Sequence, residues 1–243
     1  MELNICHLYP DLLNVYGDMG NILILKHRAE KRGIKINIHD VSIGDNFEEG
    51  KYDIVFFGGG QDYEQSIVSK DLLNTKKDGI QNYIESGKVF LSICGGYQLL
   101  GKYYTTPTGE KLKGLGILDI YTKGGNKRFI GNTVIYNDSF KETYVGFENH
   151  SGRTYIGKSL KPLGKVKVGY GNNGEDGYEG CIYKNTFCTY FHGSLLSKNP
   201  ELADRLLYTA LENKYKTFNF PELNNVLEKK AKEFIIKREN EKK

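Results

Sequence analysis

Two apolar runs that stop at glycines constrain the fold of this 243-residue chain more than any other feature. They are YDIVFFGGG, residues 52–60, and KVFLSICGG, residues 88–96. A continuous apolar run of this length fits a strand that is buried on both faces, as in a parallel sheet covered by helices. The segments around them predict two further strands and two helices, over residues 3–9 and 34–41 and over residues 20–33 and 78–88. This order predicts an α/β fold with a mostly parallel central sheet flanked by helices.

The second half of the chain has a different pattern. Helices become scarce after Tyr103, and the second half is expected to add antiparallel or mixed strands to the first half. The strand-like segments are residues 128–137, 143–150, 165–171, 179–185 and 187–192.

A helix is predicted near the end of this second half, over residues 199–214. Pro200 fits its first turn. Its expected buried face consists of Ala203, Leu206, Leu207, Ala210 and Leu211.

The chain is expected to divide into a domain over residues 1–215 and a charged, helical C-terminal extension over residues 216–243. Lysine and glutamate dominate the extension, so most of it should be solvated. We expect it to dock through one apolar stripe, formed by Leu223, Val226, Leu227, Phe234 and Ile235.

Composition narrows the class of protein. The 34 basic and 30 acidic side chains give a net charge of only +4, which does not favour nucleic-acid binding. The four cysteines form no C-x-x-C pair, and no metal site is expected. The N-terminus lacks the features of a signal peptide, and no run approaches the roughly 20 apolar residues of a membrane span. A cytoplasmic protein with reduced thiols is expected.

The stretch KVFLSICGGYQLLG places Cys94 between a predicted strand and a predicted helix. Functional groups collect at the carboxyl ends of parallel strands. A helix N-terminus lowers the pKa of an adjacent thiol, and nearby backbone amides can stabilise an oxyanion. These features favour a nucleophile at Cys94. A buried structural thiol is the alternative, and it is the better interpretation for Cys6, Cys181 and Cys188.

A thiol nucleophile needs a base, and His192 is the candidate. It ends the apolar run FCTYFH and is followed by a glycine, so its side chain could reach the same sheet edge. The glycines at 58–60 also follow a buried strand, and their amides could complete an oxyanion hole. A buried, hydrogen-bonded histidine and a simple glycine loop are the alternatives.

The segment GRTYIGKS, residues 152–159, matches the pattern of a phosphate-binding loop. Such a loop must open into a helix. Pro162 and Gly164 follow instead, and a strand comes after them. We therefore reject a phosphate-binding role.

The residues around Cys94 also carry a family resemblance. FLSICGGYQLLG, with the earlier FFGGGQD and the later TYFHG, resembles the class I glutamine amidotransferases, in particular their cobyric-acid-synthase-like branch. YPDLLNVYGDMGN, GGGQD and GFENHSGRT are similar to free-standing glutaminase subunits of lipid II isoglutaminyl synthases within that branch. The resemblance covers the chain from about Leu8 to His192.

The resemblance implies a mechanism. Cys94 would attack the side-chain amide of L-glutamine, the amides of Gly60 and Gly95 would hold the oxyanion, and His192 would transfer protons. Ammonia would pass to a MurT-like ligase subunit in a heterodimer. That ligase would use ATP to amidate the α-carboxyl of D-glutamate in the lipid II stem peptide. This chain itself would need no cofactor.

One departure from the wider class concerns the third catalytic residue. Most class I glutaminases carry His-x-Glu, whereas this chain has His192-Gly193-Ser194. A serine has no charge with which to stabilise an imidazolium. The sequence therefore predicts either a dyad or an acid from elsewhere in the chain, with weak activity until the partner docks.

Candidates for substrate binding follow from the same resemblance. Arg128 could bind the α-carboxylate of glutamine, because a guanidinium binds carboxylates through two parallel hydrogen bonds. Gln98 could support the substrate amide. Asn149, His150 and Arg153 belong to the motif GFENHSGRT and are further candidates.

Two rival functions remain at this stage. One is a glutaminase that serves another synthase, such as one that makes cobyric acid. The other is an inactive, glutaminase-like binding protein, because the acid that normally follows the histidine is missing.

Overall fold

A six-stranded sheet forms the core of the computed structural model, which describes residues 1–242. Its strands are β1 (Glu2–Leu8), β2 (Lys35–Val41), β3 (Ile54–Phe57), β4 (Val89–Ile93), β11 (Cys181–Tyr183) and β12 (Thr186–Thr189). They lie in the order β11-β12-β4-β3-β1-β2. All neighbours are parallel except β11 and β12. The predicted parallel sheet is therefore confirmed.

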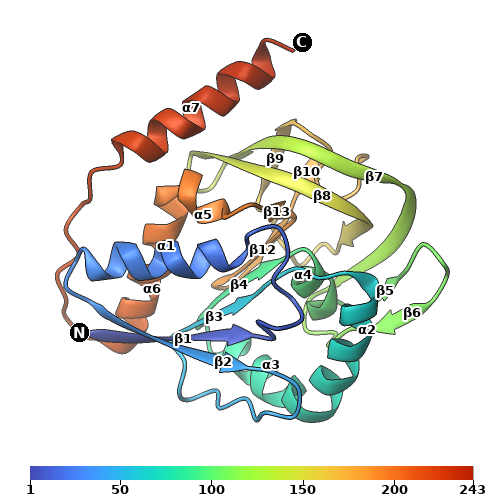
Figure 1. The fold of residues 1–243 in the computed structure, drawn as a ribbon, viewed down its shortest axis with the longest axis horizontal. Helices are drawn as coiled ribbons and strands as arrows, with labels where there is room; N and C mark the ends of the chain where they lie inside the picture. The colour runs from blue at the N-terminus through green and yellow to red at the C-terminus, as the bar shows by residue number, and fades with distance from the viewer. Residues whose placement is uncertain (243) are drawn as a thin grey trace.

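A second sheet supplies the antiparallel strands predicted for the second half. It consists of β5 (Tyr103–Thr105), β6 (Lys111–Lys113), β7 (Ile120–Asn137), β8 (Glu142–Ile156), β9 (Gly164–Val168), β10 (Tyr178–Glu179) and β13 (Phe191–His192). β7 and β8 form a long antiparallel ribbon beside the first sheet (Figure 1). Residues 152–159 run from β8 into a turn, and β9 follows. This segment does not open into a helix, which agrees with the rejection of a phosphate-binding role.

Helices cover both faces of the first sheet. The helical elements of the described residues 1–242 are α1 (Met19–Glu30), α2 (Asp62–Asp71), the π-helical turn η1 (Leu72–Lys76), α3 (Lys77–Glu85), α4 (Gly95–Leu100), α5 (Leu195–Lys198), α6 (Pro200–Lys214) and α7 (Val226–Asn240). α1 and α6 lie on one side of the sheet and α2 and α3 on the other (Figure 1). Among residues 1–242, none of these helices combines the length and apolar character that a membrane span requires.

The helix α6 has the buried face that its sequence predicts, including Leu206 and Leu207. α2 was not predicted, and only its residues Gln65, Val68 and Ser69 are buried. Only one of these three buried side chains, Val68, is apolar, so the sequence of α2 shows no amphipathic pattern.

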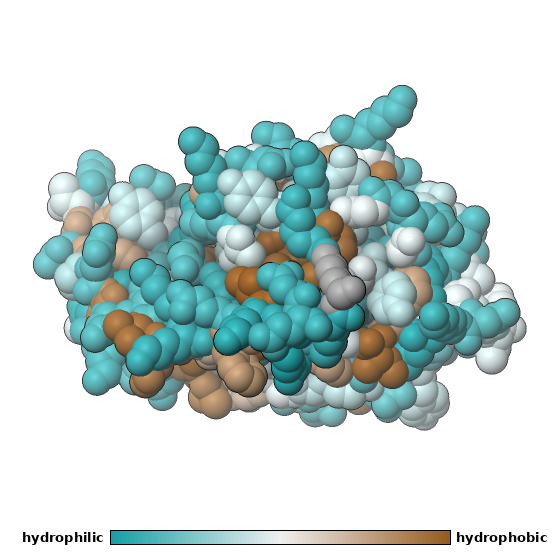
Figure 2. Space-filling view, turned by 90° about the horizontal axis from the view of Figure 1, so that it is seen from above, coloured by the Kyte–Doolittle hydropathy of each residue, from teal (hydrophilic) through white to brown (hydrophobic). Residues whose placement is uncertain are grey.

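The C-terminal helix α7 docks differently from the sequence prediction. Val226, Leu227 and Phe234 are 50%, 79% and 64% exposed, so most of the expected apolar stripe faces solvent, while Leu223 and Ile235 are half-buried. The buried residues of α7 are Lys232 and Glu239. Figure 2 looks down on this side of the molecule, where apolar side chains are visible between hydrophilic ones.

Ionic and hydrogen-bonded contacts explain this orientation of α7. The Lys232 ammonium donates to the Thr143 carbonyl and to Glu201, each at 2.9 Å. The Glu239 carboxylate accepts a 2.7 Å hydrogen bond from Asn132.

The division of the chain between residues 215 and 216 stays a prediction. Residues 216–225 contain neither helix nor strand, and residue 243 lies outside the described residues.

Candidate active site

Cys94 lies at a sharp turn between β4 and α4, as predicted. Its φ and ψ are 48° and −103°, a conformation that costs a non-glycine residue about 1–3 kcal/mol. Gly96 permits this turn, because a Cβ there would lie 2.7 Å from the Phe57 carbonyl oxygen. The backbone is held on both sides: Cys94 N–H donates to Thr189 at 2.8 Å, and Gly96 N–H donates to Gly58 at 3.1 Å. The thiol is thereby fixed at the carboxyl edge of the sheet.

His192 reaches the same edge from the other sheet. The chain leaves β12 in the first sheet and enters β13, which pairs with β8 in the second. Gly59 separates the two predicted catalytic side chains: a Cβ on it would lie 2.6 Å from Cε1 of His192 and 3.2 Å from Cβ of Cys94. The structure therefore brings the predicted nucleophile and base together.

Asp18 completes this group, and the sequence analysis did not identify it. Its Oδ1 and Oδ2 lie 3.0 and 3.2 Å from Nδ1 of His192. Oδ2 also accepts a 2.9 Å hydrogen bond from Gly59 N–H. Both Asp18 and His192 are fully buried. Asp18 lies in the motif YGDMGN, but nothing in that motif indicates which histidine it would face.

Asp18 immediately precedes α1, yet its side chain does not cap that helix. It points into the protein interior instead. Ser194, at the position where the wider class keeps an acid, makes no hydrogen bond to His192, and its hydroxyl is buried without a partner in the described structure. Of the two alternatives, a dyad or an acid from elsewhere in the chain, the position of Asp18 favours the second.

The charge on His192 is favoured by its neighbours. Burial opposes protonation, but Cys94 and the Asp18 carboxylate outweigh it and raise the pKa of His192 to about 10. An imidazolium held between sulfur and carboxylate can donate a proton on one side while the acid orients it from the other.

The backbone at Gly60 suits an oxyanion hole. Its N–H makes no hydrogen bond within the described residues 1–242. It lies beside the residue after the nucleophile, since a Cβ on Gly95 would be 3.0 Å from Gly60 N. Two amides in the predicted positions thus adjoin the Cys94 elbow.

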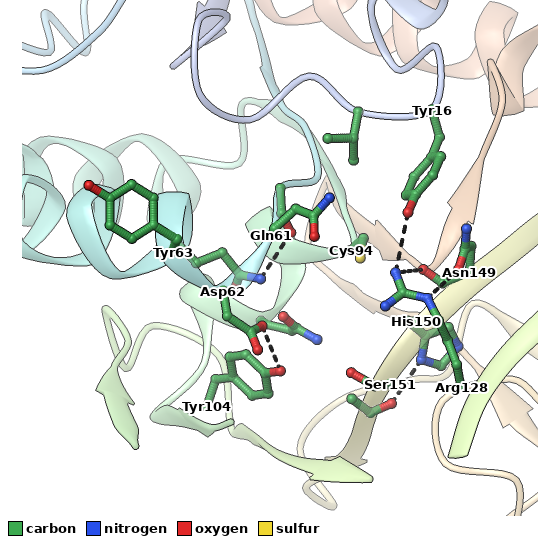
Figure 3. Close-up of a pocket in the computed structure, with 15 residues that line it drawn as sticks. Tyr16, Gln61, Asp62, Tyr63, Cys94, Tyr104, Arg128, Asn149, His150 and Ser151 are labelled. Carbon is green, nitrogen blue, oxygen red and sulfur yellow. Dashed lines mark hydrogen bonds between the residues drawn. The ribbon is translucent and has the colours of Figure 1, made fainter. Parts of the chain in front are cut away.

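A cavity of about 250 Å³ opens above Cys94, and four of the five residues predicted to bind substrate line it: Gln98, Arg128, Asn149 and His150. In Figure 3, Cys94 lies between Asp62 and Tyr104 on one side and Arg128 and Asn149 on the other. Arg128 is exposed at the mouth, where its Nε donates to Asn149 Oδ1 at 2.5 Å.

Two of the predicted residues form the inner wall of the cavity. Gln98 donates to the Tyr190 hydroxyl at 3.0 Å, and its side-chain oxygen has no partner in the described structure. His150 stacks on the Tyr190 ring at 3.6 Å and donates through Nδ1 to the Gly152 carbonyl. Burial lowers the pKa of His150 and keeps it neutral.

Arg153, the remaining candidate from the same motif, does not line this cavity. Its guanidinium lies 3.3 Å above the Phe129 ring and donates to backbone carbonyls. It supports the β7–β8 ribbon and does not face the space above Cys94.

Comparison with known proteins agrees with this geometry. A model of the CobB/CobQ-like glutamine amidotransferase domain matches residues 4–200. The chain belongs to the CobB/CobQ-like glutamine amidotransferase family. The glutamine amidotransferase activity that the Cys94 motif predicted is thereby confirmed.

Two relatives of this chain carry the same description, lipid II isoglutaminyl synthase (glutamine-hydrolyzing) subunit GatD. The one from Streptococcus pneumoniae is 54% identical over 88% of this chain and 82% of its own length. The one from Staphylococcus aureus is 47% identical over 100% of this chain and 98% of its own length. A cobyric acid synthase from Listeria monocytogenes is 32% identical over 76% of this chain and 37% of its own length.

Solved structures share the fold of this CobB/CobQ-like domain at low sequence identity. PurLQS from Thermotoga maritima aligns with a TM-score of 0.55 and 16% identity, covering 88% of this chain and 100% of the other. The glutaminase domain of Trypanosoma brucei CTPS, with bound acivicin, also gives 0.55, at 10% identity, covering 90% and 96%. Both likenesses concern the fold.

Proposed function

We propose that this chain is the glutaminase subunit of a lipid II isoglutaminyl synthase and hydrolyses L-glutamine to glutamate and ammonia. The observation that carries the catalytic part is the buried line from Asp18 through His192 to Cys94 beside an open cavity. The identity of 47% to 54% with the two GatD subunits supports the choice of synthase.

The first half of the reaction forms a thioester. The Cys94 sulfur attacks the carbonyl carbon of the glutamine side-chain amide, and the carbonyl oxygen becomes an oxyanion. The amides of Gly60 and Gly95 stabilise that oxyanion. The C–N bond then breaks, and His192 donates a proton to the departing nitrogen, so that ammonia leaves.

The second half hydrolyses the thioester. Neutral His192, left by the first step, removes a proton from water as the water oxygen attacks the thioester carbon. The C–S bond breaks, glutamate leaves, and the thiolate and imidazolium are restored. Asp18 holds the imidazole with Nε2 toward the sulfur in both halves, since its carboxylate occupies Nδ1.

The substrate is held by polar groups around the same cavity. Arg128 binds the α-carboxylate of glutamine, and its exposed position at the mouth leaves the guanidinium accessible. Gln98 accepts a hydrogen bond from the substrate amide through its unpartnered oxygen. Asn149 orients Arg128, and neutral His150 forms part of the wall.

Ammonia then serves a second subunit. The relatives are described as subunits of a synthase, and the chain is proposed to form a heterodimer with a MurT-like ligase. The ligase binds ATP and amidates the α-carboxyl of D-glutamate in the lipid II stem peptide, in the cytoplasm. The glutaminase subunit contributes no cofactor.

A glutaminase for cobyric acid synthesis is the second candidate, and the 32% identity to a Listeria cobyric acid synthase favours it less strongly. The inactive binding protein is disfavoured, because Asp18 supplies the acid whose absence suggested it.

The test uses the full chain co-purified with the candidate ligase. With L-glutamine, ATP and lipid II, we expect glutamate release and a mass change of lipid II that corresponds to amidation. Cys94→Ala and His192→Ala should abolish both signals, while ammonium chloride restores amidation to the Cys94→Ala complex. Wild-type turnover by both variants would contradict the mechanism, and amidation of a corrinoid acid alone would favour the second candidate.

A further inference from the structure

The cavity above Cys94 contains a pair of opposite charges that the mechanism uses only in part. Among the described residues that line it, Arg128 is the one guanidinium or ammonium group and Asp62 is the one carboxylate. The reaction steps assign a role to Arg128 and none to Asp62. The function of the Asp62 carboxylate, in a cavity that must bind a zwitterionic substrate, therefore has to be found outside the reaction steps.

The position of Asp62 is set by its place in a helix and by one hydrogen bond. It occupies the first turn of α2, where the helix dipole favours a negative charge. The Tyr104 hydroxyl donates to its Oδ1 at 2.9 Å, which limits the rotation of the side chain. Its second oxygen, Oδ2, makes no hydrogen bond to any of residues 1–242 and remains available to a ligand.

The chemistry of free glutamine matches this arrangement. Its α-carbon carries a carboxylate and an ammonium group, and the side-chain amide must reach Cys94. Arg128 and Asp62 lie on two sides of Cys94 (Figure 3). If Arg128 binds the carboxylate, a negative group across the cavity complements the ammonium, and Asp62 is the side chain that can supply it.

We propose that Asp62 binds the α-ammonium group of L-glutamine and thereby selects the free amino acid over amides that lack a charged α-amine. This inference rests on the proposed glutaminase function. It excludes two classes of amide from efficient hydrolysis: deaminated analogues such as glutaramate, and glutamine whose amine is acylated, as in proteins and peptides.

The test measures binding to the full-length Cys94→Ala chain, so it does not depend on turnover. Calorimetry compares L-glutamine with glutaramate. Adding Asp62→Asn should weaken glutamine binding about 10- to 100-fold, the size of a charge-assisted hydrogen bond, and change glutaramate binding less than about threefold. Tyr104→Phe, which retains the carboxylate and loses its positioning contact, should weaken glutamine binding alone, about threefold.

Asp78→Asn is the matched control, because Asp78 is also an exposed aspartate in the first turn of a helix and does not line the cavity. It should change the affinity for neither L-glutamine nor glutaramate. Equal weakening of both ligands by Asp62→Asn, or no weakening of either, would overturn the role of Asp62. The wild-type complex could fail to hydrolyse glutamine while the Cys94→Ala chain still binds L-glutamine through Asp62. That result would overturn the proposed function and leave the role of Asp62 standing. If the Cys94→Ala chain binds neither L-glutamine nor glutaramate, both the role of Asp62 and the proposed function are overturned.

Discussion

Oδ1 of Asp18 lies 3.0 Å from Nδ1 of His192, although 174 positions separate the two residues in the chain. The same carboxylate accepts the N–H of Gly59. One side chain therefore fixes both the base and the loop after β3 from which the Gly60 amide projects. This arrangement replaces the acid that the wider class places two residues after its histidine.

Asp18→Asn should lower kcat for glutamine hydrolysis about 100- to 1,000-fold with little change in KM, because an amide cannot stabilise an imidazolium as a carboxylate does. Steady-state glutaminase assays of the complex measure this change. Asp11→Asn is the control, since Asp11 is exposed on the same upstream segment and bonds to Ser42. Equal activity of the two variants would show that Asp18 has no part in catalysis.

The raised pKa of His192 predicts a specific pH dependence of stability. Its pKa of about 10 in the folded chain exceeds the ordinary 6.5. The stabilising contribution of the charged ring is therefore complete below about pH 6.5 and is lost as the pH rises toward 10. Urea unfolding of wild type and His192→Gln should differ most near pH 6, with the difference shrinking by a few kcal/mol toward pH 10. A difference that is constant across this range would contradict the assignment.

Gly59→Ala should strongly reduce activity while the chain still folds. The new methyl group would lie 2.6 Å from His192 Cε1 and 3.3 Å from Asp18 Oδ2, so it must push the base away from its acid. We expect a decrease in kcat of at least 100-fold, with far-ultraviolet circular dichroism unchanged. Gly50→Ala is the matched control, because a Cβ at Gly50 has nothing within 4 Å. An active Gly59→Ala chain would mean that the three side chains tolerate displacement.

The docking of α7 predicts an unusual ranking of substitutions. Lys232→Ala removes two hydrogen bonds and leaves Glu201 without its partner, so it should lower the free energy of unfolding by about 1–3 kcal/mol and speed amide exchange in α7. Phe234→Ser should change that free energy by less than about 0.5 kcal/mol, since the ring is 64% exposed. Urea unfolding and hydrogen exchange of both variants check this order, and a larger effect of Phe234→Ser would reverse the described orientation of the helix.

The sequence allowed prediction of those features that depend on local pattern. Continuous apolar runs predicted the parallel strands, and the turn KVFLSICGGYQLLG predicted the position of Cys94, the candidate nucleophile, at the sheet edge. His192 could be chosen because it also ends a buried strand and is followed by glycine.

The remaining features depend on contacts between distant segments. Asp18 is one of several polar residues in a loop, and only the crossing of β13 toward that loop gives it a histidine to face. α2 has too few buried apolar residues to show helical periodicity. The orientation of α7 was predicted wrongly because apolar residues usually dock a helix, whereas here Lys232 and Glu239 find partners on β8, α6 and β7.

The positions of the three side chains also bear on the synthesis of the protein. Asp18 precedes the first helix, while His192 is made only after β12 has provided the strand beside β4. A nascent chain that still lacks residue 192 can contain the thiol and its glycine loops but no base to activate them. Premature termination anywhere between Cys94 and His192 should therefore yield fragments that release no ammonia.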